Sequence, residues 1–143
     1  MTLNRYSIYH LAEAVLIQSK GTTPVPVFSI PDGAIIDLVL AMVSVPNEDA
    51  DANTLIVGDD DDPNGYIVAS DSKAVKGTVY GEDPTIRGAY LYDATKKGSF
   101  AKVYSAPKTL YLALSADMLE AEAEGEYLIY IFGHRGIPLP TPA

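Results

Sequence analysis

The sequence predicts an all-β protein in which two β-sheets pack as a sandwich in one domain. The chain has 143 residues, 48% hydrophobic and 20% charged, which suits one folded domain with a sizeable core. Its apolar runs are rich in valine and isoleucine, which favour pleated sheets. Ten prolines, eleven glycines and ten tyrosines are spread along the chain, as is typical of short strands joined by tight turns.

We divide the chain into an N-terminal arm at residues 1–11, a β-sandwich domain at 12–135 and a proline-rich tail at 136–143. The arm is polar and shows no clear period, so we expect it to become ordered against a neighbouring chain. The tail contains three prolines and should be extended. Both ends are therefore predicted to lie outside the core.

The first two strands are predicted before residue 31. Residues 12–18 favour a strand, with a helical turn as the alternative. A second strand is expected at residues 25–30, and it contains Pro26. Because proline cannot donate a hydrogen bond to a strand ladder, this strand should lie at the edge of a sheet.

The central segment is AIIDLVLAMVSV, residues 34–45. A buried helix is the competing interpretation, but the turn residues on both sides and the β-branched content favour a strand. Both faces of that strand are apolar apart from Asp37: one carries Ile36, Leu38, Leu40 and Met42, and the other carries Ile35, Val39, Ala41 and Val43. A sandwich core covers one face only, so we expect a neighbouring subunit or another segment to cover the second.

The remaining strands are predicted at residues 54–58, 66–70, 76–81, 89–92, 100–105, 109–114 and 127–132. Residues 127–132, YLIYIF, are apolar on both faces and should lie near the middle of a sheet. Residues 116–125 carry the capping pattern of a short helix, and an acidic hairpin loop is the equal alternative.

An acidic segment, residues 60–71, has the spacing of a calcium-binding loop. Oxygen ligands would come from Asp60, Asp62, Asn64, the Tyr66 carbonyl and Asp71. Closely spaced aspartates repel one another until a cation neutralises them, which makes calcium a sensible ligand. The flanks read as strands rather than helices, so the alternative is an unliganded turn between two strands. Apart from this possible calcium, the sequence indicates no cofactor.

Charge and composition limit the partners. The net charge of −9 argues against nucleic acid and anionic membranes, and the absence of cysteine excludes disulfides and thiolate metal sites. The start of the chain lacks the pattern of a signal peptide. His10 and His134 have neither metal-ligand spacing nor the setting of a catalytic triad, so we do not expect an enzyme.

Arg87 is followed by Tyr90 and Tyr92 in an otherwise acidic chain. An arginine beside two tyrosines can anchor a protein–protein interface through a carboxylate or by stacking. A local ion pair in a turn is the alternative for the arginine. We therefore regard these three residues as candidate interface residues.

Several sequence segments together resemble a known class of proteins: IPDGAII at residues 30–36, TLIVGD at 54–59, DPNGYI at 62–67 and the closing strand at 127–132. They are similar to small structural proteins of tailed bacteriophages, namely head decoration (cement) proteins and minor capsid or fibre-base proteins. The resemblance implies a jelly-roll-like β-sandwich on the virion capsid surface, often a homotrimer, that binds the major capsid protein and braces neighbouring subunits. It also implies synthesis in the host cytoplasm, and it implies no catalytic residues.

Two other functions are compatible with the same fold. The first is a carbohydrate-binding or fibre-base adaptor module of a phage virion that uses tyrosines and aspartates, with calcium in the acidic segment. The second is an enzyme, for which a jelly-roll hydrolase would need carboxylates or metal ligands converging in one pocket. The virion structural function accounts best for strands that are apolar on both faces.

Overall fold

The structure is a computed structural model, and it describes residues 6–93, 98–99 and 102–138. The strands in chain order are β1 (Tyr6–Ser19), β2 (Val25–Ile30), β3 (Ala34–Val45), β4 (Thr54–Gly58), β5 (Ile67–Asp71), β6 (Val79–Tyr80), β7 (Tyr92–Asp93), β8 (Gly98–Ser99), β9 (Lys108–Leu114) and β10 (Gly125–Pro138). A single 3₁₀ turn, Pro84–Ile86, is the only helical element in these described ranges, and no helix there is long and apolar enough to span a membrane.

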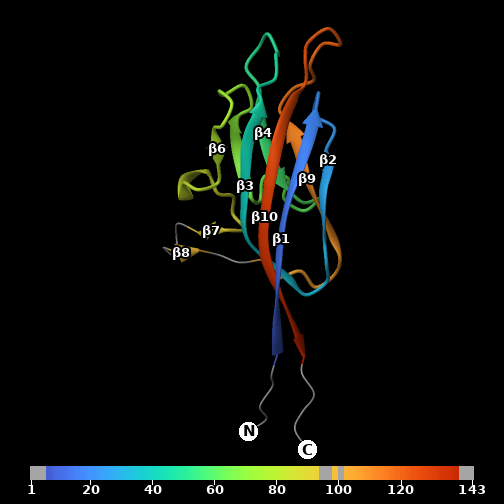
Figure 1. The fold of residues 1–143 in the computed structure, drawn as a ribbon, viewed down its shortest axis with the longest axis vertical. Helices are drawn as coiled ribbons and strands as arrows, with labels where there is room; N and C mark the ends of the chain where they lie inside the picture. The colour runs from blue at the N-terminus through green and yellow to red at the C-terminus, as the bar shows by residue number, and fades with distance from the viewer. Residues whose placement is uncertain (1–5, 94–97, 100–101, 139–143) are drawn as a thin grey trace, which may run out of the picture.

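Two four-stranded antiparallel sheets pack face to face as a sandwich (Figure 1). The first sheet has the order β1-β10-β3-β6, and the second has the order β2-β9-β4-β5. The chain forms nested antiparallel pairs, because β1 pairs with β10, β2 with β9, β3 with β6 and β4 with β5. Eight strands nested in this way over two sheets make a jelly roll, so the predicted fold class is confirmed.

Several predicted positions are confirmed within this topology. Strand β2, which contains Pro26, is an edge strand of the second sheet. Strand β3 has the predicted bounds, and both it and β10 lie inside the first sheet. The strand predicted at residues 76–81 shortens to Val79–Tyr80, and the one predicted at 89–92 shifts to Tyr92–Asp93.

Two predictions on local structure need correction. Residues 116–125 form no helix before β10 begins, because Asp117 bonds another loop instead of capping: its Oδ1 accepts from the backbone N–H of Thr22 at 2.8 Å. The loop alternative is therefore confirmed. Residues 100–101 of the predicted strand at 100–105 lie outside the described residues, and the described remainder forms only an isolated bridge from Val103 to Ile35.

The two predicted faces of β3 are also wrong in part, because a β-bulge changes the alternation. Ile36 pairs with Gly133 and Leu38 pairs with Phe132, which leaves Asp37 as the extra residue. Before the bulge Ala34 and Ile36 point into the core; after it the buried residues are Val39, Ala41 and Val43. The bulge thus gives β3 one continuous buried face.

The core lies between the two sheets. Ile36 and Val39 of β3, Leu112 of β9 and Ile129 of β10 are all fully buried within one hydrophobic cluster. This cluster covers one face of each sheet and leaves the opposite face of the first sheet without a covering layer from the described chain.

The ends of β1 and β10 form a two-stranded ribbon that projects beyond the sandwich (Figure 1). Pairing runs from Leu11–Gly133 out to Tyr6–Pro138. Part of the predicted arm and part of the predicted tail therefore lie side by side in this ribbon. Tyr6 and Ile8 on it are 57% and 65% exposed.

Candidate functional site

The outer face of the first sheet is the main candidate for binding. Side chains alternate along each strand, so residues between the buried positions point outward. Three cross-strand rows, which we call the outer face, follow from the register: Leu16–Leu128–Met42–Val79, Ala14–Tyr130–Leu40 and Ala12–Phe132–Leu38.

The outer face is apolar and partly open to solvent. Leu16 is 54% exposed, Phe132 40% and Val79 38%, while the inner residues of the rows are half-buried. Standard strand spacings give the three rows a footprint on the order of 300–400 Å². Contiguous apolar patches of this size are often functional on soluble proteins.

Polar pairs bound the outer face at both ends. At one end Gln18 Nε2 donates to Glu126 Oε1 at 2.6 Å. At the other end Asp37, the bulge residue, contacts His134, with 2.7 Å between its Oδ2 and the ring Nδ1. The three rows themselves contain no charged residue, although the whole chain carries a net charge of −9. An uncharged face on an acidic protein suits burial against a partner.

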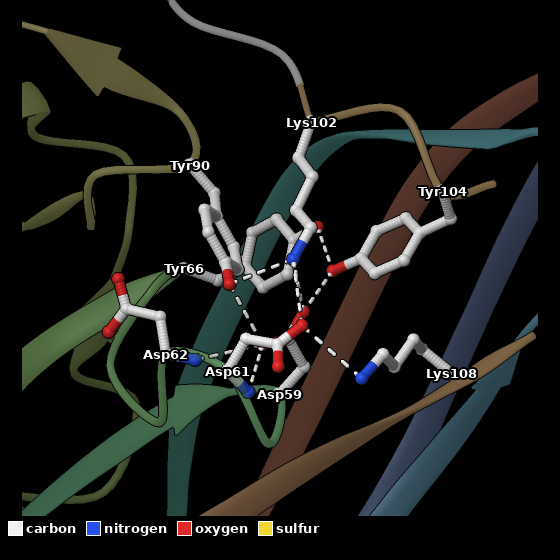
Figure 2. A network of polar contacts seen from close by, with 8 residues as sticks. All are labelled: Asp59, Asp61, Asp62, Tyr66, Tyr90, Lys102, Tyr104 and Lys108. Carbon is white, nitrogen blue, oxygen red and sulfur yellow. Dashed lines mark hydrogen bonds and ion pairs between the residues drawn. The ribbon is translucent and has the colours of Figure 1, made fainter. Parts of the chain in front are cut away.

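A buried polar cluster lies within the sandwich, centred on Asp59 (Figure 2). Asp59 directly follows β4, and it continues the alternation that buries Leu55 and Val57. Lys102 and Tyr104 reach it from the segment before β9, and Tyr90 comes from the segment before β7. The cluster therefore joins three loop segments far apart in the sequence.

The Asp59 carboxylate accepts five hydrogen bonds. Lys102 Nζ donates to Oδ2 at 2.9 Å, and the Tyr104 hydroxyl donates to the same oxygen at 2.8 Å. The Tyr90 hydroxyl donates to Oδ1 at 2.9 Å, as do the backbone N–H groups of Asp61 and Asp62 at 3.0 Å.

Further contacts join the side chains of the cluster. The Tyr66 hydroxyl lies 2.7 Å from that of Tyr104; since Tyr104 gives its proton to Asp59, Tyr66 is the donor. Lys102 Nζ also lies 4.1 Å from the centroid of the Tyr90 ring, a cation–π geometry. No buried side-chain nitrogen or oxygen in the described part of the chain lacks a partner.

The electrostatics of the cluster favour ionised Asp59. Burial opposes the charged carboxylate, but the bonds from Lys102, the Asp62 N–H, Tyr104 and Tyr90 outweigh it and lower its pKa from 3.8 to about 2. Burial likewise raises the pKa of Tyr66 and of Tyr104 above the usual value for tyrosine. Asp59 is only 1% exposed and all five of its hydrogen bonds are made within the chain, so the cluster ties three segments of the fold together.

The five residues predicted as calcium ligands are not gathered at one point. Asp60, Asp62 and Asn64 lie in the loop after β4, whereas Asp71 ends β5. A strand between Tyr66 and Asp71 separates them by roughly 16 Å. The Tyr66 carbonyl already accepts from the Gly88 N–H at 3.0 Å. Among the described residues no group of three or more histidines, aspartates or glutamates is placed to hold a metal ion, and calcium binding stays a prediction.

The three candidate interface residues, Arg87, Tyr90 and Tyr92, have different environments in the structure. Arg87 Nε donates to the Gly81 carbonyl at 2.9 Å, so this side chain closes a local turn. Tyr90 belongs to the polar cluster, and Tyr92 is 36% exposed. Whether any of them contacts a partner stays a prediction, and Tyr92 is the most accessible of the three.

Local sequence patterns do not reveal the polar cluster, because its residues come from segments that are far apart in the chain. The alternation Leu55, Val57, Asp59 already places this aspartate on the buried face. The alternation that puts Lys102 and Tyr104 on one face was visible as well. An aspartate on a buried face, together with a lysine on another segment that faces inward, indicates a buried ion pair of the Asp59–Lys102 kind.

Two solved structures are similar to this fold. One is a chain of "Cyanophage Pam1 capsid asymmetric unit", with a TM-score of 0.58, 14% identity, and coverage of 91% of this chain and 86% of that one. The other is a chain of "Acidic stable capsid structure of Helicobacter pylori bacteriophage KHP30", with a TM-score of 0.56, 14% identity, and coverage of 96% and 100%. No protein-family model and no curated protein matches the chain. At this identity the likeness shows that the chain shares its fold with these two chains.

Proposed function

We propose that this chain is a non-enzymatic structural component of a tailed-phage virion, a head decoration or cement protein that binds the capsid surface. In this function it braces neighbouring copies of the major capsid protein through protein–protein contacts and associates with itself, as a homotrimer in the form that the sequence resemblance implies. Three independent lines support the proposal: the sequence resemblance, the fold shared with chains from two phage capsid structures, and the outer face.

The outer face is the observation that carries the proposal. A strand apolar on both sides needs cover on both sides, and the described chain covers only the core side of β3 and β10. Burial of apolar surface is the main driving force of association. The projecting ribbon of β1 and β10, with exposed Tyr6 and Ile8, adds a second contact element that can reach beyond the body of one copy.

Co-sedimentation with capsid shells that lack the protein tests this proposal. The wild-type chain should sediment with the shells at saturable stoichiometry. The double variant Leu16→Asp, Phe132→Asp places two charges on the outer face and should weaken binding by about 100-fold, the size expected for two lost contacts near the centre of an interface.

The matched control is Val75→Asp with Leu119→Asp. These residues are 78% and 70% exposed and lie outside the outer face, so the control makes the same change of charge on apolar side chains that are more accessible than Leu16 and Phe132. It should bind as the wild type does. No binding by the wild type, or equal loss in both double variants, contradicts the proposal.

A further inference from the structure

The sandwich has four sheet edges, and three of them are protected against pairing with another chain. Strand β6 has only two residues. Strand β2 carries Pro26 and a register shift beside it. Strand β5 has five residues, and an isolated bridge from Ile67 to Arg87 covers part of its free side. Short strands, prolines, bulges and covering segments are the usual protections of sheet edges.

The fourth edge, β1, has none of these protections. It has 14 residues, pairs with β10 without a register shift, and contains neither proline nor lysine. Glu13 is its one charged side chain. Half of the backbone N–H and C=O groups of an edge strand point away from its partner, so β1 presents a long regular row of them for a further strand.

We propose that the free edge of β1 pairs antiparallel with β1 of a second copy of this chain, with Leu11 at the centre of the contact. The purpose of this contact rests on the proposed function. Pairing joins the first sheets of the two copies into one continuous sheet, and it merges their outer faces into one larger surface. Two linked faces bind a regular lattice more strongly than one. The contact is two-fold, so a three-fold assembly would use other surfaces.

The side chains of β1 favour this self-pairing and this register. Centred on Leu11, the contact sets Tyr6 opposite Leu16 and Ile8 opposite Ala14, which brings large apolar side chains beside apolar partners. Every even-numbered residue from Tyr6 to Leu16 is exposed in the single chain and would gain a neighbour.

Charge and shape also favour a centre at Leu11. Glu13 would face Tyr9 of the second copy, whereas a centre at residue 13 would set two glutamates directly opposite each other. The ribbon end of β1 already projects beyond the sandwich, so the two bodies lie toward opposite ends of the paired strands (Figure 1).

Disulfide trapping tests the register, because the chain has no cysteine of its own. A mixture of the Ile8→Cys and Ala14→Cys variants places the two thiols opposite each other in the proposed pairing. On mild oxidation it should give about tenfold more linked heterodimer than a mixture of Ile8→Cys and Ala12→Cys, because disulfides need Cβ atoms about 4 Å apart.

Sedimentation velocity tests the pairing itself on the full chain. The wild type should form dimers that dissociate on dilution. The variant Ile8→Lys, Ala14→Lys sets lysine opposite lysine twice and should raise the dissociation constant by about tenfold or more. The control Val75→Lys, Leu119→Lys changes the net charge equally away from β1 and should pair as the wild type does.

A wild-type chain that stays monomeric, or equal trapping in the two cysteine mixtures, overturns the inference and leaves capsid co-sedimentation as an independent result. If the copies pair as described but the chain fails to bind shells, the proposed function falls and the β1 contact stands.

Discussion

The buried cluster around Asp59 and the outer face of the first sheet differ in whether the chain itself satisfies groups that are unfavourable in their surroundings. The cluster buries a charge and then satisfies every oxygen of it within the chain. The outer face holds apolar side chains such as Leu16 and Phe132 and leaves them open. A buried charge whose hydrogen bonds are all satisfied within the chain stabilises the fold by itself. An exposed apolar surface is removed from water only when a partner covers it. Substitutions in the two regions should therefore affect different measurements.

Among the substitutions of polar residues, the largest loss of stability is expected from Asp59→Asn. The amide cannot neutralise Lys102 and cannot accept all five hydrogen bonds, so the free energy of unfolding should fall by about 3 kcal/mol. Urea denaturation of the variant and the wild type measures the difference. The exposed neighbour is the control: Asp60→Asn should change the value by less than about 0.5 kcal/mol. Similar free energies of unfolding for the two variants would contradict a stabilising role of the Asp59 carboxylate.

Acid should weaken the wild type through the same residue. The pKa of Asp59 is about 2 in the folded chain, against 3.8 for an ordinary aspartate. Because the folded pKa is the lower one, this contribution is complete above about pH 4 and disappears as the pH falls through 2; it amounts to about 2 kcal/mol. Denaturation curves at pH 4 and pH 2 measure it. In Asp59→Asn the loss over this range should be smaller by about that amount, and an unchanged loss would assign acid sensitivity to other carboxyls.

The contrast between the two regions also explains what the sequence could predict. Strand bounds such as Ala34–Val45 follow from local turns and β-branched residues, and the edge position of β2 follows from Pro26 alone. The faces of β3 could not be predicted, because the bulge at Asp37 is defined by its pairing with β10. A regular alternation assumes that each residue has one partner across the sheet, and a bulge breaks that assumption.

The polar cluster depends on contacts distant in sequence, and for that reason it was harder to predict than the strands. Lys102 lies 43 residues from Asp59, and only the jelly-roll topology brings them together. Four aspartates in a row drew attention to the loop as a cation site, yet the first of them is neutralised by a lysine of the same chain. The outer face, by contrast, could be predicted, since residues 127–132 are apolar at every position.

Tyr104→Phe is expected to lower the free energy of unfolding by less than Asp59→Asn does. This change removes the hydroxyl that donates to Asp59 at 2.8 Å and leaves the Tyr66 hydroxyl without its acceptor. The free energy of unfolding should fall by about 1–2 kcal/mol, and the pKa of Asp59 should rise because one bond to its charged form is lost. Thermal and urea unfolding measure the first effect, and the pH dependence measures the second. Tyr6→Phe on the exposed ribbon is the control and should be neutral.

On the outer face the effect on stability should be slight. Phe132→Ala is expected to lower the free energy of unfolding of the single chain by about 0.5 kcal/mol, because this side chain is already 40% exposed. Ile129, on the same strand, is fully buried, and Ile129→Ala should cost about 3 kcal/mol. Urea denaturation at low protein concentration compares them. A large loss at Phe132 under dilution would mean that the single chain already covers this face.

The smallest effect is expected from calcium. Asp61 lies 3.2 Å from Lys108 Nζ and 3.8 Å from Lys102 Nζ, so lysines already reduce the repulsion that a cation would relieve. With Asp71 at the far end of β5, millimolar calcium should raise Tm by less than about 1 °C, and a chelator should lower it no further. Scanning calorimetry with calcium, with magnesium and with chelator measures this. A rise of several degrees that is specific to calcium and absent in Asp60→Asn, Asp62→Asn would establish a cation site in the loop, because only a ligand that prefers the folded chain raises its stability.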